Sequence, residues 1–160
     1  MLTKKLTCAD LHIRPMAKDD LNEILSVERE AFPDPWTNTM FDSEIEQRSS
    51  NLFVAEKKTN GLKYIITGYA VYRIIDSYAE IMNLCVKAEF RRMRIGASLL
   101  EYMLSAIATE RIAQIYLEVR TTNLPAVNLY SRYGFILNRI RKNYYTDGSD
   151  ACEMIRTVSI

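Results

Sequence analysis

The sequence predicts a single α/β domain in which helices accompany one mixed sheet, and three observations lead to this prediction. Segments with alternating apolar residues are interspersed with segments whose apolar residues recur at helical spacing. The chain has 160 residues, without repeats or a Pro/Gly/Ser-rich linker, which suits one domain with its own core. Its composition, 48% hydrophobic and 26% charged, is typical of a soluble globular protein. We therefore expect one domain over residues 1–160.

The first part of the chain predicts a strand followed by two helices. The segment LHIRPM alternates as a short strand does, and apolar residues then recur at helical spacing from Lys18 to about Glu30. The segment FPDPW ends this helix, because its two prolines cannot continue it. Thr37 is the expected N-cap of the second helix, whose apolar residues are Met40, Phe41 and Ile45.

The rest of the chain predicts strands and helices in the order β-β-β-α-β-α-β-β. Asn60-Gly61 marks a turn between the first two of these strands, and Gly134 stands where a left-handed residue would end the last helix. The expected strands are Phe53–Glu56, Tyr64–Ile74, Tyr78–Val86, Ile115–Val119, Ile136–Tyr144 and Ala151–Val158, and the expected helices are Ile95–Glu110 and Leu124–Tyr133.

Composition excludes several classes of function. The formal net charge is +1, so nothing draws the whole molecule toward nucleic acid or anionic lipid. The cysteines Cys8, Cys85 and Cys152 are odd in number and far apart, which argues against disulfides and a zinc site, and His12 is the only histidine. We find neither a membrane-spanning apolar run nor a signal peptide, so we expect a cytoplasmic protein without a membrane or nucleic-acid partner.

An arginine-rich turn between the expected strand Tyr78–Val86 and the expected helix Ile95–Glu110 is a candidate phosphate site. The first turn of a helix has unpaired N–H groups and partial positive charge, and Arg91, Arg92 and Arg94 add charge beside it. Gly96 allows a close approach of the backbone. The alternative is a solvated basic turn that only connects two elements. Neither a GxGxxG nor a Walker A motif occurs, so a dinucleotide or P-loop fold is not supported.

Glu118 is unexpected because it lies within an apolar strand. Side chains alternate along a strand, so Leu117 and Val119 face one side while Glu118 faces the other. A carboxylate covered by a helix needs a partner or a wet cleft. One interpretation is a catalytic group, and the other is an ion pair with Arg120, which lies on the same face. Three further residues have structural interpretations: Tyr130 packs a short helix on the sheet, Asn123 caps that helix, and Cys85 is a small buried apolar residue.

Several segments together resemble the GNAT acyltransferase superfamily. RRMRIGASLL resembles its pyrophosphate-binding signature, AEIMNLCV the preceding strand, and AFPDPW an element of the substrate-side loop. LEVRTTNLPAVNLYSRYGF and RKNYYTDGSDACEM resemble one branch, the RimI-type ribosomal-protein-alanine N-acetyltransferases. The resemblance covers about residues 13–154. It implies the GNAT fold, a mixed and mostly antiparallel sheet flanked by helices.

The resemblance also implies an activity and a set of roles. The activity is acetyl transfer from acetyl-CoA, without a metal, to the N-terminal alanine of a small-subunit ribosomal protein. Glu118 would be the base, which is needed because an α-ammonium has a pKa of about 8, and Tyr130 would be the acid. Backbone N–H groups around Cys85 and Val86 would stabilise the oxyanion. The implied cofactor-binding residues are Leu84, Cys85, Val86, Arg91, Arg92, Met93, Arg94, Ile95, Gly96, Ala97 and Asn123.

The resemblance leaves the acceptor less well defined. It places Tyr144 and Tyr145 along the peptide slot, with Phe32 and Trp36 on its other side, while packing remains the competing interpretation for these four residues. Arg94 departs from the signature, which has a glycine there, so we expect weaker cofactor binding. The alternatives are a lysine, polyamine or small-amine acetyltransferase of the same fold, and a non-catalytic CoA-binding module.

Overall fold

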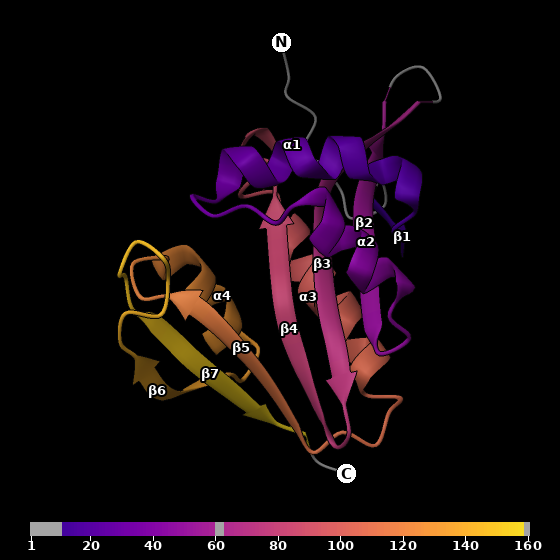
Figure 1. Cartoon of the computed structure of the whole chain (residues 1–160). Coiled ribbons are helices and arrows are strands. Elements are labelled where there is room, and N and C mark those ends of the chain that lie inside the picture. Colours follow the sequence, from indigo (N-terminus) through magenta and orange to yellow (C-terminus); the bar gives the residue numbers. More distant parts are fainter. Residues whose placement is uncertain (1–10, 60–62, 159–160) are drawn as a thin grey trace. The chain divides into compact units, whose positions relative to one another are not determined.

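The described part of the chain contains seven strands and four α-helices, which follow one another in the predicted order (Figure 1). The computed structural model describes residues 11–59 and 63–158. The strands are β1 (Leu11–Pro15), β2 (Ser50–Lys58), β3 (Tyr64–Ile75), β4 (Tyr78–Val86), β5 (Gln114–Arg120), β6 (Ile136–Arg141) and β7 (Ala151–Thr157). The α-helices are α1 (Leu21–Ala31), α2 (Asn38–Glu46), α3 (Ile95–Ile107) and α4 (Leu124–Arg132), and two short 3-10 helices are η2 (Lys18–Asp20) and η3 (Ala88–Phe90).

The strands form a mixed sheet in the hydrogen-bonding order β1-β2-β3-β4-β5-β7-β6. Strand β1 pairs antiparallel with β2, and β7 pairs antiparallel with both β5 and β6, whereas β4 and β5 run parallel. The chain divides into two compact units, Met1–Val71 with Asn83–Met103, and Tyr72–Met82 with Leu104–Ile160. We describe each unit by itself.

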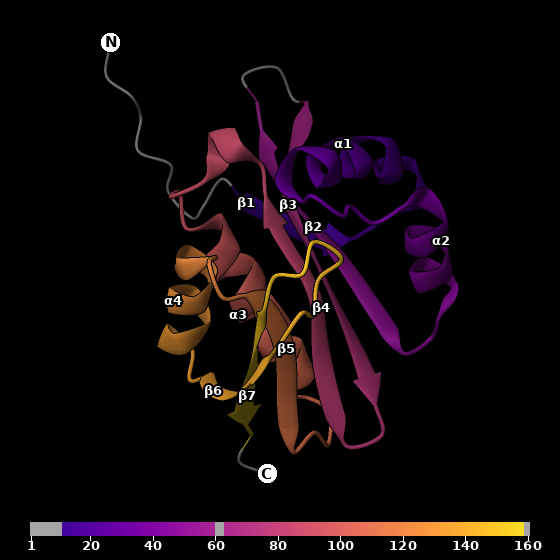
Figure 2. The same cartoon turned by 60° about the vertical axis from the view of Figure 1, so that its left-hand side comes forward.

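In the first unit, helices cover both faces of the strands. Figures 1 and 2 show α1 and α2 on one side of β2 and β3, with α3 on the other. Strand alternation explains this arrangement at β3. Tyr69 packs against Phe41 of α2 with ring centroids 5.7 Å apart, while a side chain at Gly68 would approach Leu99 of α3. Because both faces are covered, Ile66–Tyr72 of β3 is buried without interruption.

In the second unit, β5 has one fully buried face and one partly exposed face. Ile115, Leu117 and Val119 are buried, and the intervening side chains are intermediate. Helix α4 ends as predicted at Gly134, which has φ +84°. The N–H of Phe135 donates to the Tyr130 carbonyl and the N–H of Gly134 to the Ser131 carbonyl, which together form a Schellman motif. The Phe135 ring supplies the apolar contact of this motif, because it packs against the Tyr130 ring with the two ring centroids 5.8 Å apart.

Most predicted elements are confirmed, and four boundaries need correction. Helix α3 ends at Ile107 and not at Glu110, because the N–H groups of Thr109 and Glu110 donate to carbonyls three residues back, as in a turn. The first helix begins at Leu21, because Arg14 and the Ala17 N–H hold Asp20 and a 3-10 turn precedes it. Strand β2 is longer than Phe53–Glu56, because its pairing with β1 runs from Phe53 to Lys57. Strand β6 ends at Arg141, because Asn143 adopts φ +50°. The predicted turn at 60–61 lies outside the described residues.

One further prediction concerns the membrane. Within 11–59 and 63–158, no helix is both long and apolar enough to cross a bilayer.

Candidate active site

The arginine-rich turn has an unusual backbone just before helix α3. Arg92 and Arg94 are left-handed, with φ +63° and +64°, whereas Arg91 is extended, with φ −63° and ψ 157°. The Ser98 N–H donates to the Arg94 carbonyl, so Arg94 begins helix α3, and the N–H groups of its first turn have no acceptor within the helix. Arg94 therefore reaches the left-handed conformation that the glycine of the signature would favour, at a cost of about 1–2 kcal/mol.

Strand β4 leads into this turn and is closely packed. A Cβ at Gly68 would lie 2.6 Å from the Cys85 carbonyl oxygen, so β3 and β4 approach each other too closely for a side chain there. The Lys87 N–H donates to the Thr67 carbonyl, and the Arg91 Nε donates to the Val86 carbonyl. Burial, followed by the charge of Glu28, raises the pKa of the Cys85 thiol to about 12. Cys85 is therefore a neutral thiol and not a nucleophile at neutral pH.

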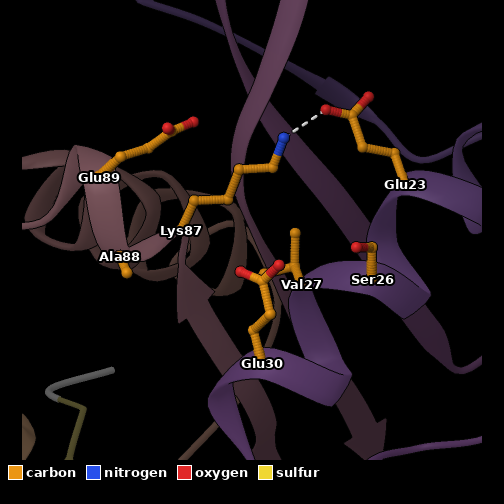
Figure 3. A pocket seen from close by; sticks show the side chains of 7 residues that line it. All are labelled: Glu23, Ser26, Val27, Glu30, Lys87, Ala88 and Glu89. Atoms are coloured by element: carbon orange, nitrogen blue, oxygen red, sulfur yellow. Dashed lines mark hydrogen bonds and ion pairs between the residues drawn. The ribbon is translucent and has the colours of Figure 1, made fainter.

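A cavity of about 280 Å³ lies between helix α1 and the segment that follows β4 (Figure 3). Its lining includes three glutamates, Glu23, Glu30 and Glu89, and one lysine, Lys87. The Lys87 amine points to Glu23 and forms an ion pair with it. Because carboxylates predominate, this cavity is poorly suited to a phosphate, and the arginine-rich turn is the better candidate in this unit.

The loop with Phe32 and Trp36 joins α1 to α2, and both residues are partly buried. The Trp36 ring packs on Phe41, with centroids 5.1 Å apart. Glu28 lies beneath this loop with no exposed surface. One of its carboxylate oxygens accepts the Trp36 N–H at 2.7 Å, and the other accepts the Asn83 amide at 2.8 Å. Burial raises the pKa of Glu28 to about 6, although these two hydrogen bonds oppose the shift.

In the second unit, Glu118 forms an ion pair with Arg141. The Arg141 Nη1 lies 2.6 Å from the Glu118 Oε1, and the Glu118 side chain is 17% exposed. The structural interpretation of Glu118 as one member of an ion pair agrees with this contact, although the observed partner is Arg141, and Arg120 pairs with Asp147 at 2.8 Å. Arg141 reaches Glu118 across β7, since β6 and β5 both pair with that strand.

A second carboxylate lies directly opposite Glu118 on β7. The register pairs Glu118 with Glu153, and residues opposite each other in an antiparallel pair share a face. Two acidic neighbours would repel, but each has its own guanidinium. Arg139 binds both oxygens of Glu153 at 2.8–3.0 Å, and the Asn138 amide donates to it at 2.7 Å. The Arg139 hydrogen bond is the main reason why the pKa of Glu153 is lowered.

Tyr144 and Tyr145 are connected to this charged cluster through their rings. The guanidinium of Arg141 lies 4.4 Å from the Tyr144 ring centroid, and that of Arg120 lies 3.9 Å from the Tyr145 centroid. Burial raises the pKa of Tyr144, and it raises the pKa of Tyr145 to about 12. Both phenols therefore keep their protons at neutral pH and can donate a hydrogen bond. The structure thus brings Glu118 and Tyr144 to the same arginine.

The other predicted residues of this unit have clear structural roles. Asn123 caps α4, since its Oδ1 accepts the Ala126 N–H at 3.3 Å. Tyr130 is buried and its ring packs edge to face against Phe135. These contacts agree with the structural interpretations, and the catalytic role of Tyr130 and the cofactor role of Asn123 stay predictions. Among residues 11–59 and 63–158, no group of three or more His, Cys, Asp or Glu side chains could hold a metal ion.

Three residues of the site were missed from the sequence, although two of them had a signal. Glu28 lies seven residues after Leu21 and four after Ile24, on the apolar face of α1, where a carboxylate is unexpected. Gly68 interrupts an apolar strand, which often marks a close backbone approach. Arg141 had no such signal, because its partner is set by pairing across three strands.

The fold and the site define the protein class. The chain belongs to the acetyltransferase (GNAT) family, whose model matches residues 21–135. The N-terminus of a helix binds phosphates well, and the basic, left-handed turn at Arg92–Arg94 lies directly before such an N-terminus. This position is suited to the phosphates of a nucleotide cofactor.

Within this family, the chain is similar to enzymes that acetylate protein N-termini. It is 30% identical over 151 residues to the ribosomal protein bS18-alanine N-acetyltransferase of Escherichia coli K12, covering 92% of this chain and 98% of that one. It is also 30% identical over 147 residues to an N-alpha-acetyltransferase of Sulfolobus acidocaldarius, covering 87% and 88%. The crystal structure of the E. coli ribosomal-protein-S18-alanine N-acetyltransferase superposes with a TM-score of 0.81 and 29% identity, over 94% of this chain and 95% of that one.

Proposed function

We propose that this protein is an acetyl-CoA-dependent N-terminal acetyltransferase that modifies the N-terminal alanine of a small-subunit ribosomal protein in the cytoplasm. The observation that carries the proposal is the full-length similarity to the E. coli enzyme named for that substrate. The Glu118 side chain is also 17% exposed, and only one of its oxygens lies against Arg141, which leaves the other free to meet an acceptor amine.

The first unit supplies the cofactor-binding residues in this proposal. The N–H groups from Arg92 to Ala97, with the side chains of Arg91, Arg92 and Arg94, bind the pyrophosphate. The backbone of Leu84–Val86 holds the pantetheine arm by hydrogen bonds. Asn123 is assigned to the cofactor by resemblance to the family alone.

The second unit supplies the proton acceptor. Glu118 takes a proton from the α-ammonium, directly or through water, and the free amine attacks the thioester carbon. The N–H groups of Cys85 and Val86 stabilise the oxyanion, and Tyr130 protonates the CoA thiolate as the C–S bond breaks. The attacking nitrogen then gives up its second proton, which restores the Tyr130 phenol, so the products are the amide and CoA-SH, with one proton left on Glu118. Arg141 contacts only Oε1 in the described ion pair, so the proposal assigns the transferred proton to Oε2 of Glu118.

Substitution of the two opposed carboxylates tests the base. We expect Glu118→Gln to lower kcat by roughly 10²–10⁴-fold, the usual contribution of a positioned base. Glu153→Gln is the matched control, because it removes the neighbouring carboxylate from the same face, and its kcat should stay within about tenfold of the wild type. Steady-state kinetics with an alanine-starting peptide measure both. Equal loss in the two variants, or none in Glu118→Gln, would contradict the assignment.

The acceptor is tested with a panel of amines. Mass spectrometry should find acetylation of the alanine-starting peptide, and none when its N-terminus is already blocked. Lysine side chains in the blocked peptide and polyamines should remain unmodified. Acetylation confined to those last two acceptors would overturn the N-terminal assignment, and tight acetyl-CoA binding in calorimetry without any turnover would indicate a non-catalytic module.

A further inference from the structure

Glu28 is attached to both ends of the loop between α1 and α2. Its backbone carbonyl accepts the Phe32 N–H at 2.9 Å, which ends the helix. Its side chain accepts the Trp36 N–H at 2.7 Å, at the other end of the loop. The two prolines between these residues have no N–H to offer. One residue therefore receives the N–H groups at both ends of the segment Phe32–Trp36, which is five of the six residues between α1 and α2.

The same carboxylate also binds the cofactor strand. Its second oxygen accepts the amide of Asn83, which directly precedes Leu84 on β4. A fully buried carboxylate is unfavourable unless its oxygens are hydrogen-bonded, so the arrangement is stable only while both donors stay in place. The other acids buried in this unit have different partners: Glu44 accepts from Ser50, and Glu56 pairs with Arg14.

We propose that Glu28 is a positioning residue that fixes the Phe32–Trp36 loop to strand β4. This inference rests on the proposed function, in which the loop lines the acceptor peptide and β4 holds acetyl-CoA. The bridge through Glu28 sets the spacing between the acceptor wall and the thioester strand. The aromatic series Trp36, Phe41 and Tyr69 packs the loop onto β3, and Glu28 joins the loop to β4 by hydrogen bonds.

Glu28→Ala and Glu28→Gln separate positioning from simple destabilisation. Glutamine can preserve both contacts: its oxygen accepts the Trp36 N–H, and its NH2 donates to Asn83 after the Asn83 amide turns over. Alanine preserves neither. We therefore expect Glu28→Ala to raise the KM for the peptide at least tenfold with a smaller change in kcat, and Glu28→Gln to stay within about threefold of wild type.

Trp36 gives a readout that needs no substrate, because it is the only tryptophan of the chain. We call the Glu28 carboxylate with its two hydrogen bonds the anchor of the loop. If this anchor is lost, the Trp36 indole becomes more accessible. The acrylamide quenching constant of Glu28→Ala should therefore rise about twofold or more relative to wild type and Glu28→Gln. Asn83→Ala removes only the hydrogen bond between Glu28 and β4, and it should raise the KM for acetyl-CoA. This variant replaces Glu28→Ala in the test if Glu28→Ala does not fold. Glu44→Ala is the control: it removes another buried acid of this unit and should change neither quenching nor KM.

The outcomes distinguish the anchor from the proposed activity. The proposal is supported if Glu28→Ala shows both increased acrylamide quenching of Trp36 and a raised KM for the peptide. Unchanged quenching and unchanged KM, or equal effects in Glu44→Ala, overturn it. If no variant, including wild type, acetylates any peptide, the proposed function fails, and the quenching data still decide whether Glu28 anchors the loop.

Discussion

Three carboxyl groups of this protein differ in their electrostatic partners, and these partners set what each group can do. Glu153 is held by a bidentate arginine, which keeps its pKa low. Glu118 contacts Arg141 through one oxygen and stays partly exposed. Glu28 has no cation among its described hydrogen bonds, only two neutral donors, so burial dominates and its pKa is raised to about 6. Of the three, the sequence drew attention only to Glu118.

The raised pKa of Glu28 predicts a pH dependence of stability. A carboxyl whose folded-state pKa lies above its unfolded value of 4.5 binds its proton more tightly in the native state. Its contribution is therefore fully present below pH 4.5 and is lost as the pH rises through 6. The total change is about 2 kcal/mol, from 1.36 kcal/mol per pKa unit. The neighbouring Cys85 thiol does not titrate in this range.

Urea unfolding of wild type and Glu28→Gln between pH 4.5 and 7.5 measures this difference. Glutamine cannot titrate, so the wild type should lose stability relative to the variant by about 2 kcal/mol over that range. Parallel stability curves would show that Glu28 titrates alike in the folded and unfolded chain. The remaining carboxylates are common to both proteins and cancel in the comparison.

At the scale of elements, hydrophobic periodicity predicted the order of helices and strands but not their precise limits or contacts. Local signals worked where the cause is local: Thr37 and Asn123 cap their helices, and Gly134 ends α4. They failed where the cause lies on another element. The end of β6 depends on the turn at Asn143, and the partner of Glu118 lies on β6, 23 residues further along the chain.

Gly68 shows how a strand contact bears on the candidate cofactor site. An added Cβ would lie 2.6 Å from the Cys85 carbonyl oxygen and 3.3 Å from Leu99 Cδ1, so Gly68→Ala must displace the backbone of β4. We expect a loss of about 1–3 kcal/mol in unfolding free energy, as for other overpacked sites. Since β4 is the proposed pantetheine strand, the Kd for acetyl-CoA should also rise, by about tenfold or more.

Val71→Ala is the matched control for this substitution. Val71 is fully buried on the same strand, and its truncation should cost a similar free energy without pressing on β4. Thermal unfolding and calorimetry with acetyl-CoA measure the two quantities. If both variants bind acetyl-CoA as the wild type does, the approach of Gly68 to β4 has no bearing on the cofactor; if both lose affinity equally, the loss reflects stability alone.

At the scale of the whole molecule, charge is almost balanced. The chain has 21 basic and 20 acidic side chains, so long-range attraction of an anionic cofactor is weak. A ligand with several phosphates must then depend on local charge, and the arginine-rich turn concentrates three guanidinium groups within four residues. The fold class followed from composition and pattern, whereas the left-handed backbone of the proposed phosphate site at Arg92 and Arg94 was not predicted from the sequence.

Two charge-removing substitutions decide between local and global attraction. Arg92→Gln removes one positive charge from the turn and keeps a long side chain, while Lys58→Gln removes one from an exposed position at the end of β2. Both lower the net charge from +1 to 0. If the phosphates bind at the turn, only Arg92→Gln should weaken acetyl-CoA binding, by about tenfold for one charge-assisted contact.

The Arg92→Gln substitution should also make the Kd for acetyl-CoA rise less steeply with salt, because fewer charge contacts remain to be screened. Calorimetric titrations in 50 and 500 mM KCl measure both effects, and equal losses in the two variants would mean that the turn does not bind the phosphates.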